Sequence, residues 1–199
     1  MQLPLIGAGF IVLVCIYFVF FYPWQLRWGA TQAEVKRSMP GDEIVSRPSF
    51  DATRAVTIHA SAQSIYPWLV QMGITGTGWH RYTLLENSGK ESEESLLPEH
   101  QTLEAGDLIP VSHNGKPGRW VKYLRKNKWV LWWDKSGDTS WVWEIQPQGD
   151  DNARLIARVR AKHRWFSPAS LFNPLAEFFH ILTMRRSMLG IKRRAEKLL

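Results

Sequence analysis

Cysteine is almost absent from this chain, because Cys15 is the only one among 199 residues. A single cysteine excludes disulfide bonds within the chain and metal sites built from several thiolates. The six histidines are scattered along the sequence and show no HExxH or comparable spacing of metal ligands. We therefore expect no bound metal and no cofactor.

The sequence also lacks the short motifs of common enzyme classes, with no GxSxG, no Walker loop and no GxGxxG. The segment GITGTGW from Gly73 to Trp79 is rich in glycine, but it follows a predicted helix instead of a strand, which is the wrong context for binding phosphate. The best enzymatic candidates lie in GWHRYTLLEN, where His80, Tyr82 and Glu86 could present an acid or a base. Tyr82 and Glu86 also have helical i, i+4 spacing, so they could simply support each other.

Tryptophan, by contrast, is abundant, with 11 residues in the chain. The segment WVLWWDKSGDTSWVWEIQ from Trp129 to Gln146 has turn-forming residues in its middle and predicts a β-hairpin. Neighbouring strand residues point to opposite faces, so Trp132 and Trp133 cannot both face one cavity. The rings of this hairpin either fill a core or line a cavity that holds an apolar molecule. As cavity-lining residues we select Trp133, Trp141, Trp143 and Tyr123.

The longest apolar run, from Leu5 to Tyr22, contains no charged side chain. As a helix it would be about 27 Å long, close to the roughly 30 Å of a bilayer core. It predicts an N-terminal transmembrane anchor over residues 1–23, with a cleaved signal peptide and a buried core helix as the alternatives. The positive charges after the run predict a single-pass membrane protein with most of the chain in the cytoplasm. The residues assigned to the membrane interface are Tyr22, Trp24, Arg27 and Trp28.

The rest of the chain divides into a connector without a clear period, residues 24–50, and one folded domain, residues 51–199. Helical spacing of apolar residues predicts helices over 62–72 and 79–87 and a long helix over 173–199. Alternation of apolar and polar residues predicts strands over 52–59, after Asp107, and over 119–125, 128–133, 140–146 and 153–164. This order of elements is typical of an α+β fold in which an antiparallel sheet is wrapped around a long C-terminal helix.

The segment 153–164 has the clearest alternation of the chain. Its apolar face holds Leu155, Ala157, Val159 and Ala161, and its other face holds Arg154, Arg158, Arg160, Lys162 and Arg164, with Ile156 as the exception. This pattern predicts a sheet with one apolar face and one wet, basic face. With a formal net charge of +7, such a face could attract anionic lipid, or it could be solvated without a partner. Because aromatic residues are not interleaved with these charges, we expect no nucleic-acid partner.

Six stretches carry a resemblance to a known family: TRAVTIHASAQSIYPWLVQMG, GWHRYTLLEN, LEAGDLIPV, SWVWEIQP, ARVRA and MLGIKRRAE. In this order and spacing, over about 52–197, the chain resembles the SRPBCC group of START-like helix-grip proteins, which includes polyketide cyclase/dehydrase and lipid-transport members. The resemblance implies a deep apolar pocket between the sheet and the long helix. It supplies no shared catalytic signature, and function does not follow from fold.

Together these observations predict a membrane-anchored, non-catalytic helix-grip domain that binds an apolar small molecule or a lipid in an aromatic-lined pocket. The alternatives are a cyclase- or dehydratase-like enzyme acting on a polyketide-like or aromatic substrate, and a membrane-tethered interaction module with a basic docking face. The residues predicted to bind the ligand are Trp68, Met72, Trp79, Tyr82, Tyr123, Trp133, Trp141, Trp143, Phe178, Ile181, Met184 and Met188.

Overall fold

The structure, a computed structural model, describes residues 9, 12, 14–72, 95–98, 101–109, 119–162 and 173–197, with the side chains of the last helix described from Glu177 onward. The N-terminal elements are η1 (Tyr17–Phe21), α2 (Tyr22–Arg27) and α3 (Gln32–Lys36). The remaining elements are β1 (Phe50–Ile58), α4 (Ala62–Gln71), β2 (Leu108–Ile109), β3 (Arg119–Arg125), β4 (Trp129–Trp133), β5 (Thr139–Pro147), β6 (Ala153–Ala161) and α5 (Asn173–Glu196).

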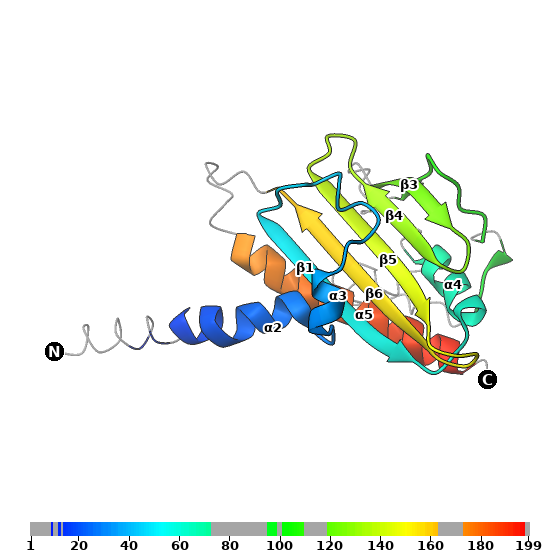
Figure 1. Cartoon of the computed structure of the whole chain (residues 1–199), viewed down its shortest axis with the longest axis horizontal. Helices are drawn as coiled ribbons and strands as arrows, with labels where there is room; N and C mark the ends of the chain where they lie inside the picture. Colours follow the sequence, from blue (N-terminus) through cyan, green and yellow to red (C-terminus); the bar gives the residue numbers. More distant parts are fainter. Residues whose placement is uncertain are drawn as a thin grey trace, which may run out of the picture.

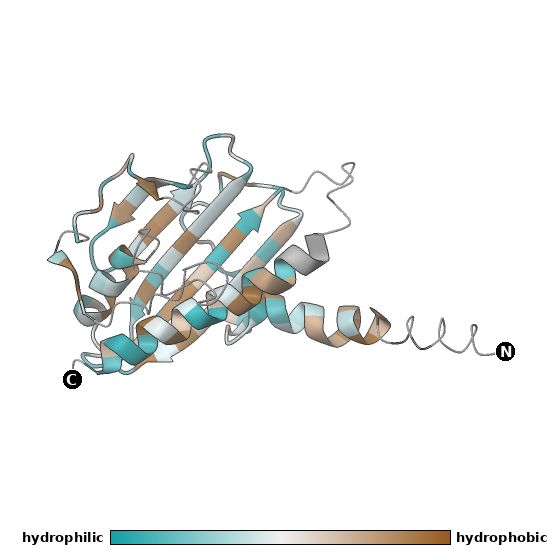
Figure 2. Cartoon of the chain, turned by 180° about the vertical axis from the view of Figure 1, so that it is seen from behind, coloured by the Kyte–Doolittle hydropathy of each residue, from teal (hydrophilic) through white to brown (hydrophobic). Residues whose placement is uncertain are grey.

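The six strands form one antiparallel sheet in the order β1-β6-β5-β4-β3-β2. The helices α4 and α5 lie on one face, called the inner face here, and α3 lies on the opposite, outer face (Figure 1). In Figure 2, where the molecule is seen from behind, α5 runs across the sheet on the side facing the viewer. The predicted α+β plan, an antiparallel sheet with a long C-terminal helix, is therefore confirmed.

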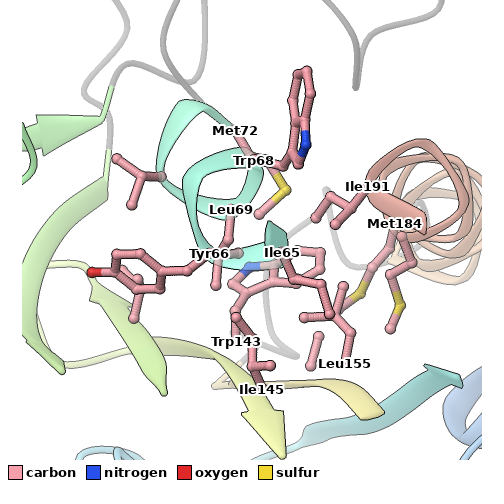
Figure 3. Packing of buried hydrophobic residues seen from close by; sticks show 14 of the residues in the cluster. Ile65, Tyr66, Trp68, Leu69, Met72, Trp143, Ile145, Leu155, Met184 and Ile191 are labelled. Carbon is pink, nitrogen blue, oxygen red and sulfur yellow. The ribbon is translucent and has the colours of Figure 1, made fainter. Parts of the chain in front are cut away.

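The inner face carries the main hydrophobic core. The N-cap Ser61 accepts a hydrogen bond from the backbone N–H of Ser64, and the apolar stripe of α4 then faces the sheet. Figure 3 shows Trp143 and Leu155 of the sheet meeting Ile65 of α4, with Met184 of α5 beside them. All four side chains are at most 1% exposed. Burial of these side chains holds the two helices on the sheet.

The outer face differs from the prediction of a wet, basic surface. Arg158 is only 4% exposed, and its guanidinium donates to the Asp42 carboxylate at 2.7 Å and to the carbonyls of residues 34, 35 and 37. Arg154 makes a two-pronged pair with Glu34 at 2.9 and 2.8 Å. The segment predicted as an irregular connector thus contains α3 and covers these arginines. The prediction was wrong because the acids that neutralise this face lie far away in the sequence.

The same cover explains the break in the alternation of β6. Ile156 lies on the outer face and packs in a second apolar cluster with Met39, Ala55, Leu131 and Val142. Met39 comes from the covering segment, so this face has an apolar centre surrounded by ion pairs. The segment 28–47 therefore completes the fold of the domain.

The predicted transmembrane helix is corrected by the structure. Within the described residues, which leave out 1–8, 10, 11 and 13, no helix is long and apolar enough to cross a membrane. The elements found in this region are the short π-helix η1 and the short helix α2, which project from one end of the sheet (Figure 1). Gln25 of α2 is 2% exposed because it is packed against β1 and α5. The assignment of residues 1–23 as a membrane anchor, and the single-pass membrane localisation derived from it, are therefore withdrawn.

Some of the residues assigned to a membrane interface pack within the domain itself. The hydroxyl of Tyr22 hydrogen-bonds to Glu177 of α5, and burial together with this carboxylate raises the pKa of Tyr22 to about 12. Trp28 packs against the inner core, with the Arg185 guanidinium 5.3 Å from its ring centroid. Arg27 is the last residue of α2, and Trp24 is 52% exposed.

Gly29 tests how closely the N-terminal segment is packed on β1. Its φ is +70°, and a Cβ there would overlap the carbonyl oxygen of Ala55. We expect Gly29→Ala to lower the free energy of unfolding by about 3 kcal/mol or more, since left-handed strain of about 1–2 kcal/mol adds to a backbone overlap. Gly137 is the matched control, because its φ is +77° but a Cβ would meet nothing within 4 Å. Urea unfolding should show a smaller loss of unfolding free energy for Gly137→Ala, which suffers the backbone strain alone. Equal losses in the two variants would contradict the close packing of Gly29 on β1.

Candidate ligand-binding site

Three indoles form one group on the inner face, which we call the tryptophan cluster: Trp132, Trp141 and Trp143. Trp132 of β4 lies directly opposite Trp141 of β5, and cross-strand neighbours share a face. The ring centroids are 5.3 Å apart for Trp132 and Trp141 and 5.6 Å apart for Trp141 and Trp143, which are stacked at 28°. Trp143 is fully buried, whereas Trp141 stays half-buried. Trp141 is therefore the least buried residue of the cluster.

An arginine–histidine pair adjoins this cluster. The ring of His180 on α5 is 5.4 Å from that of Trp141 and meets Phe50 edge-on at 5.8 Å. Nη1 of Arg54 lies 3.0 Å from Nδ1 of His180. A guanidinium can only donate, so Nδ1 is the acceptor and the imidazole carries its proton on Nε2. The strand β1 and the helix α5 thus place a cation and a hydrogen-bond donor beside the indoles.

Arg54 is completely buried in this position. Its Nε donates to the carbonyl of Gln25 at 2.7 Å, and Nη1 also lies 2.9 Å from the sulfur of Met184. Burial lowers the pKa of Arg54 to about 9, while the negative charge of Glu177 opposes this shift. At neutral pH the side chain is therefore still a cation.

Burial also governs the charge of His180. It lowers the pKa of this imidazole to about 3, with further contributions from the positive charges of Arg54 and Arg119. The guanidinium of Arg119 lies 4.8 Å from the ring centroid of Trp141, and burial lowers its pKa against the opposing charge of Asp134. His180 is thus neutral near pH 7 and lies close to the positive charges of Arg54 and Arg119.

Several polar atoms at this site are buried without a hydrogen-bond partner among the residues that the structure describes. They are Nε1 of each indole in the tryptophan cluster, Nε2 of His180 and Nη2 of Arg54. A buried donor left unpaired costs about 1–3 kcal/mol, so such atoms are rare in folded proteins. Each of them is a donor in the protonation states derived above. The site is therefore equipped to receive hydrogen-bond acceptors.

The structure brings several of the predicted ligand residues onto the inner face. Trp141 and Trp143 belong to the tryptophan cluster, and Met184 contacts Arg54. Four further residues are buried in α4, at its end and in α5: Trp68, Met72, Ile181 and Met188. Trp68 points away from the sheet in Figure 3, with the Arg194 guanidinium 5.8 Å from its ring centroid.

Other predicted residues lie elsewhere. Trp133 and Tyr123 are on the outer face, where the Lys122 ammonium lies 3.7 and 5.7 Å from their ring centroids. Phe178 of α5 is 40% exposed. The remaining candidates, Trp79, Tyr82, His80 and Glu86, lie outside the described residues.

Sequence reasoning missed Arg54, Arg119, Trp132 and His180 as site residues. One signal for Arg54 was present, because it shares a strand face with the apolar Val56 and Ile58. A charged residue on an apolar face needs a buried partner. For His180 the sequence contained no such signal, since only the packing of α5 on β1 brings it to Arg54.

Comparison with known proteins supports no assignment from sequence. No family profile and no curated protein match the chain. Solved structures do match: a polyketide-cyclase-like protein from Corynebacterium glutamicum is 14% identical over 72% of this chain and 89% of its own, with a TM-score of 0.46. A START superfamily protein from Mycobacterium smegmatis is 16% identical over 75% and 99%, with a TM-score of 0.45.

The fold is a helix grip. The topology of this chain carries that description, because one antiparallel sheet holds a long C-terminal helix against its inner face. The resemblance stated from the sequence is thus confirmed at the level of the fold. Likenesses this weak carry no argument about ligand or activity, which must be argued from the residues of this chain.

His180 makes the stability of the domain depend on pH. An unfolded histidine takes up a proton near its usual pKa of 6.5, whereas the folded one stays neutral down to about pH 3. Stability from this group is therefore complete above pH 6.5 and declines by about 1.4 kcal/mol per pH unit below it. We expect the difference in unfolding free energy between wild type and His180→Phe to shrink by about 2 kcal/mol from pH 6.5 to pH 5. Urea titrations at both pH values measure it, and a pH-independent difference would contradict the buried neutral state.

Proposed function

We propose that the inner face binds an apolar or lipid-like small molecule and that the tryptophan cluster supplies the contact surface. The observation that carries this proposal is half-buried Trp141, whose ring stacks on that of buried Trp143, together with the buried donors of the site that have no partner among the described residues. Ligand sites typically combine a largely aromatic lining with a few convergent polar groups. An aromatic platform of this kind binds apolar molecules through dispersion and burial of ring surface.

Binding without catalysis fits the described residues better than acid–base chemistry. A catalytic acid or base works best with a pKa near the working pH. The imidazole at this site has a pKa of about 3 and is held by Arg54, so it is a poor proton acceptor near pH 7. It serves instead as a donor through Nε2.

A neutral fluorescent probe, N-phenylnaphthylamine, tests the proposed site. We expect its fluorescence to rise on binding, with energy transfer from tryptophan, and Trp141→Leu to weaken binding about tenfold because one aromatic wall is lost. The matched control is Trp133→Leu, which removes another half-buried indole, on β4 but from the outer face.

Trp133→Leu should leave the affinity within about twofold of wild type, since its ring lies away from the platform. Circular dichroism and thermal unfolding establish that both variants are folded. Absence of saturable binding to wild type, or equal losses in the two variants, would refute the inner-face site.

A further inference from the structure

We propose that the ligand carries an anionic oxygen group of the carboxylate type, and that Arg54 and His180 bind this group beside the tryptophan cluster. The inference rests on the proposed function and names the chemical class of its ligand: an organic acid with an apolar body. Four observations support it, namely the excess of donors, the charge of Arg54, the geometry of Arg54 and His180, and the placement of the indoles.

The first observation is that the buried atoms of the site that lack a partner in the described part of the chain are all donors. Nη2 of Arg54, Nε2 of His180 and the three indole nitrogens need acceptors, and none of these atoms can accept a hydrogen bond in the states present at neutral pH. A ligand that supplied further donors would leave them unpaired. Carboxylate oxygens fit, because each carboxylate has about four lone-pair positions and no donor.

The second observation concerns the charge of Arg54. Within the described part of the chain its hydrogen-bond partners are a carbonyl, a thioether and an imidazole, none of which is an anion. Two acids act on the site through their charge. Glu177 acts on Arg54 and also accepts a hydrogen bond from the hydroxyl of Tyr22, and Asp134 acts on Arg119. A completely buried cation is strongly stabilised by a hydrogen-bonded anion.

The third observation is geometric. Nη1 of Arg54 and Nδ1 of His180 are 3.0 Å apart, so the guanidinium and the imidazole are already joined. The contacts of Arg54 with Gln25, Met184 and His180 hold its guanidinium in place before any ligand binds. Preorganised donors of this kind lose little side-chain entropy on binding.

The indoles determine what accompanies the acid group. His180 is in ring contact with Trp141 at 5.4 Å, so an acid bound there has its remaining atoms next to an aromatic surface. A free inorganic anion would contact only the polar groups of this site. An amphipathic acid contacts both the polar groups and the aromatic rings.

Displacement of the bound N-phenylnaphthylamine by decanoate and by decanol tests the inference. The two competitors have hydrocarbon chains of nearly the same length and differ in the head group. The ratio of the concentrations at which they displace the probe therefore reports the contribution of the anionic group. We expect decanoate to displace the probe at a concentration about tenfold or more below that of decanol, as charge-assisted hydrogen bonds would give. Arg54→Met should abolish this preference, and because both competitors are compared in the same variant, their ratio separates loss of the anion contact from a general loss of affinity.

Arg158→Met is the matched control, because it also removes one buried arginine of the sheet and one positive charge, but on the outer face. It should keep the preference for decanoate. His180→Phe, which retains a ring beside Trp141, should reduce the preference and provides a second variant if Arg54→Met does not fold.

The outcomes separate the two proposals. If the probe does not bind wild type, the proposed function fails and the inference fails with it. If the probe binds and both competitors displace it equally, the site binds apolar molecules and the acid inference alone is overturned. A preference that Arg54→Met and Arg158→Met reduce equally reports only the net charge of the protein and also overturns it.

Discussion

Burial of Arg54 is the constraint on which the arrangement of this domain depends. A guanidinium cannot be left without partners in a protein interior, because the desolvation cost is several kcal/mol. Here three partners come from two separate segments: the carbonyl of Gln25 on α2, and the imidazole of His180 and the sulfur of Met184 on α5. One strand residue therefore holds the N-terminal helix and the C-terminal helix to the same edge of the sheet. It also places a cation where the aromatic surface of the inner face begins.

The buried arginines of the outer face are stabilised differently, by acidic partners. Arg154 and Arg158 are paired with carboxylates and carbonyls of the segment that contains α3, so their charges are neutralised within the chain. Burial alone would raise the pKa of Glu34, but its hydrogen bonds with Arg154 and Thr31 lower it below its usual value. The contrast between the two faces is informative. Arginines of the outer face have acidic partners within hydrogen-bond distance, whereas in the described part of the chain none of the hydrogen-bond partners of Arg54 is an anion.

The high tryptophan content has two structural consequences. On the inner face the cluster of three indoles continues the core of α4 and α5 and ends in a half-buried ring. On the outer face Trp133 lies beneath the ammonium of Lys122, and Trp120 lies 3.5 Å from that of Lys135. Aromatic residues therefore contribute to both faces, and in the described part of the chain the buried indole nitrogens without a hydrogen-bond partner belong to rings of the inner core. This difference, and not the number of tryptophans, distinguishes a candidate site from ordinary packing.

The sequence by itself determined the order and type of the elements, because local periodicity reports which residues of a strand or helix share a face. The strands β3 to β6, the helix α4 and the helix α5 follow from that pattern. Only the tertiary structure decided which face each segment covers. Alternation shows that Trp132 and Trp133 point in opposite directions, but the packing of α4 and α5 selects which one points inward. Likewise, the partners of Arg158 lie up to 124 residues away, and no local pattern encodes a contact at that separation.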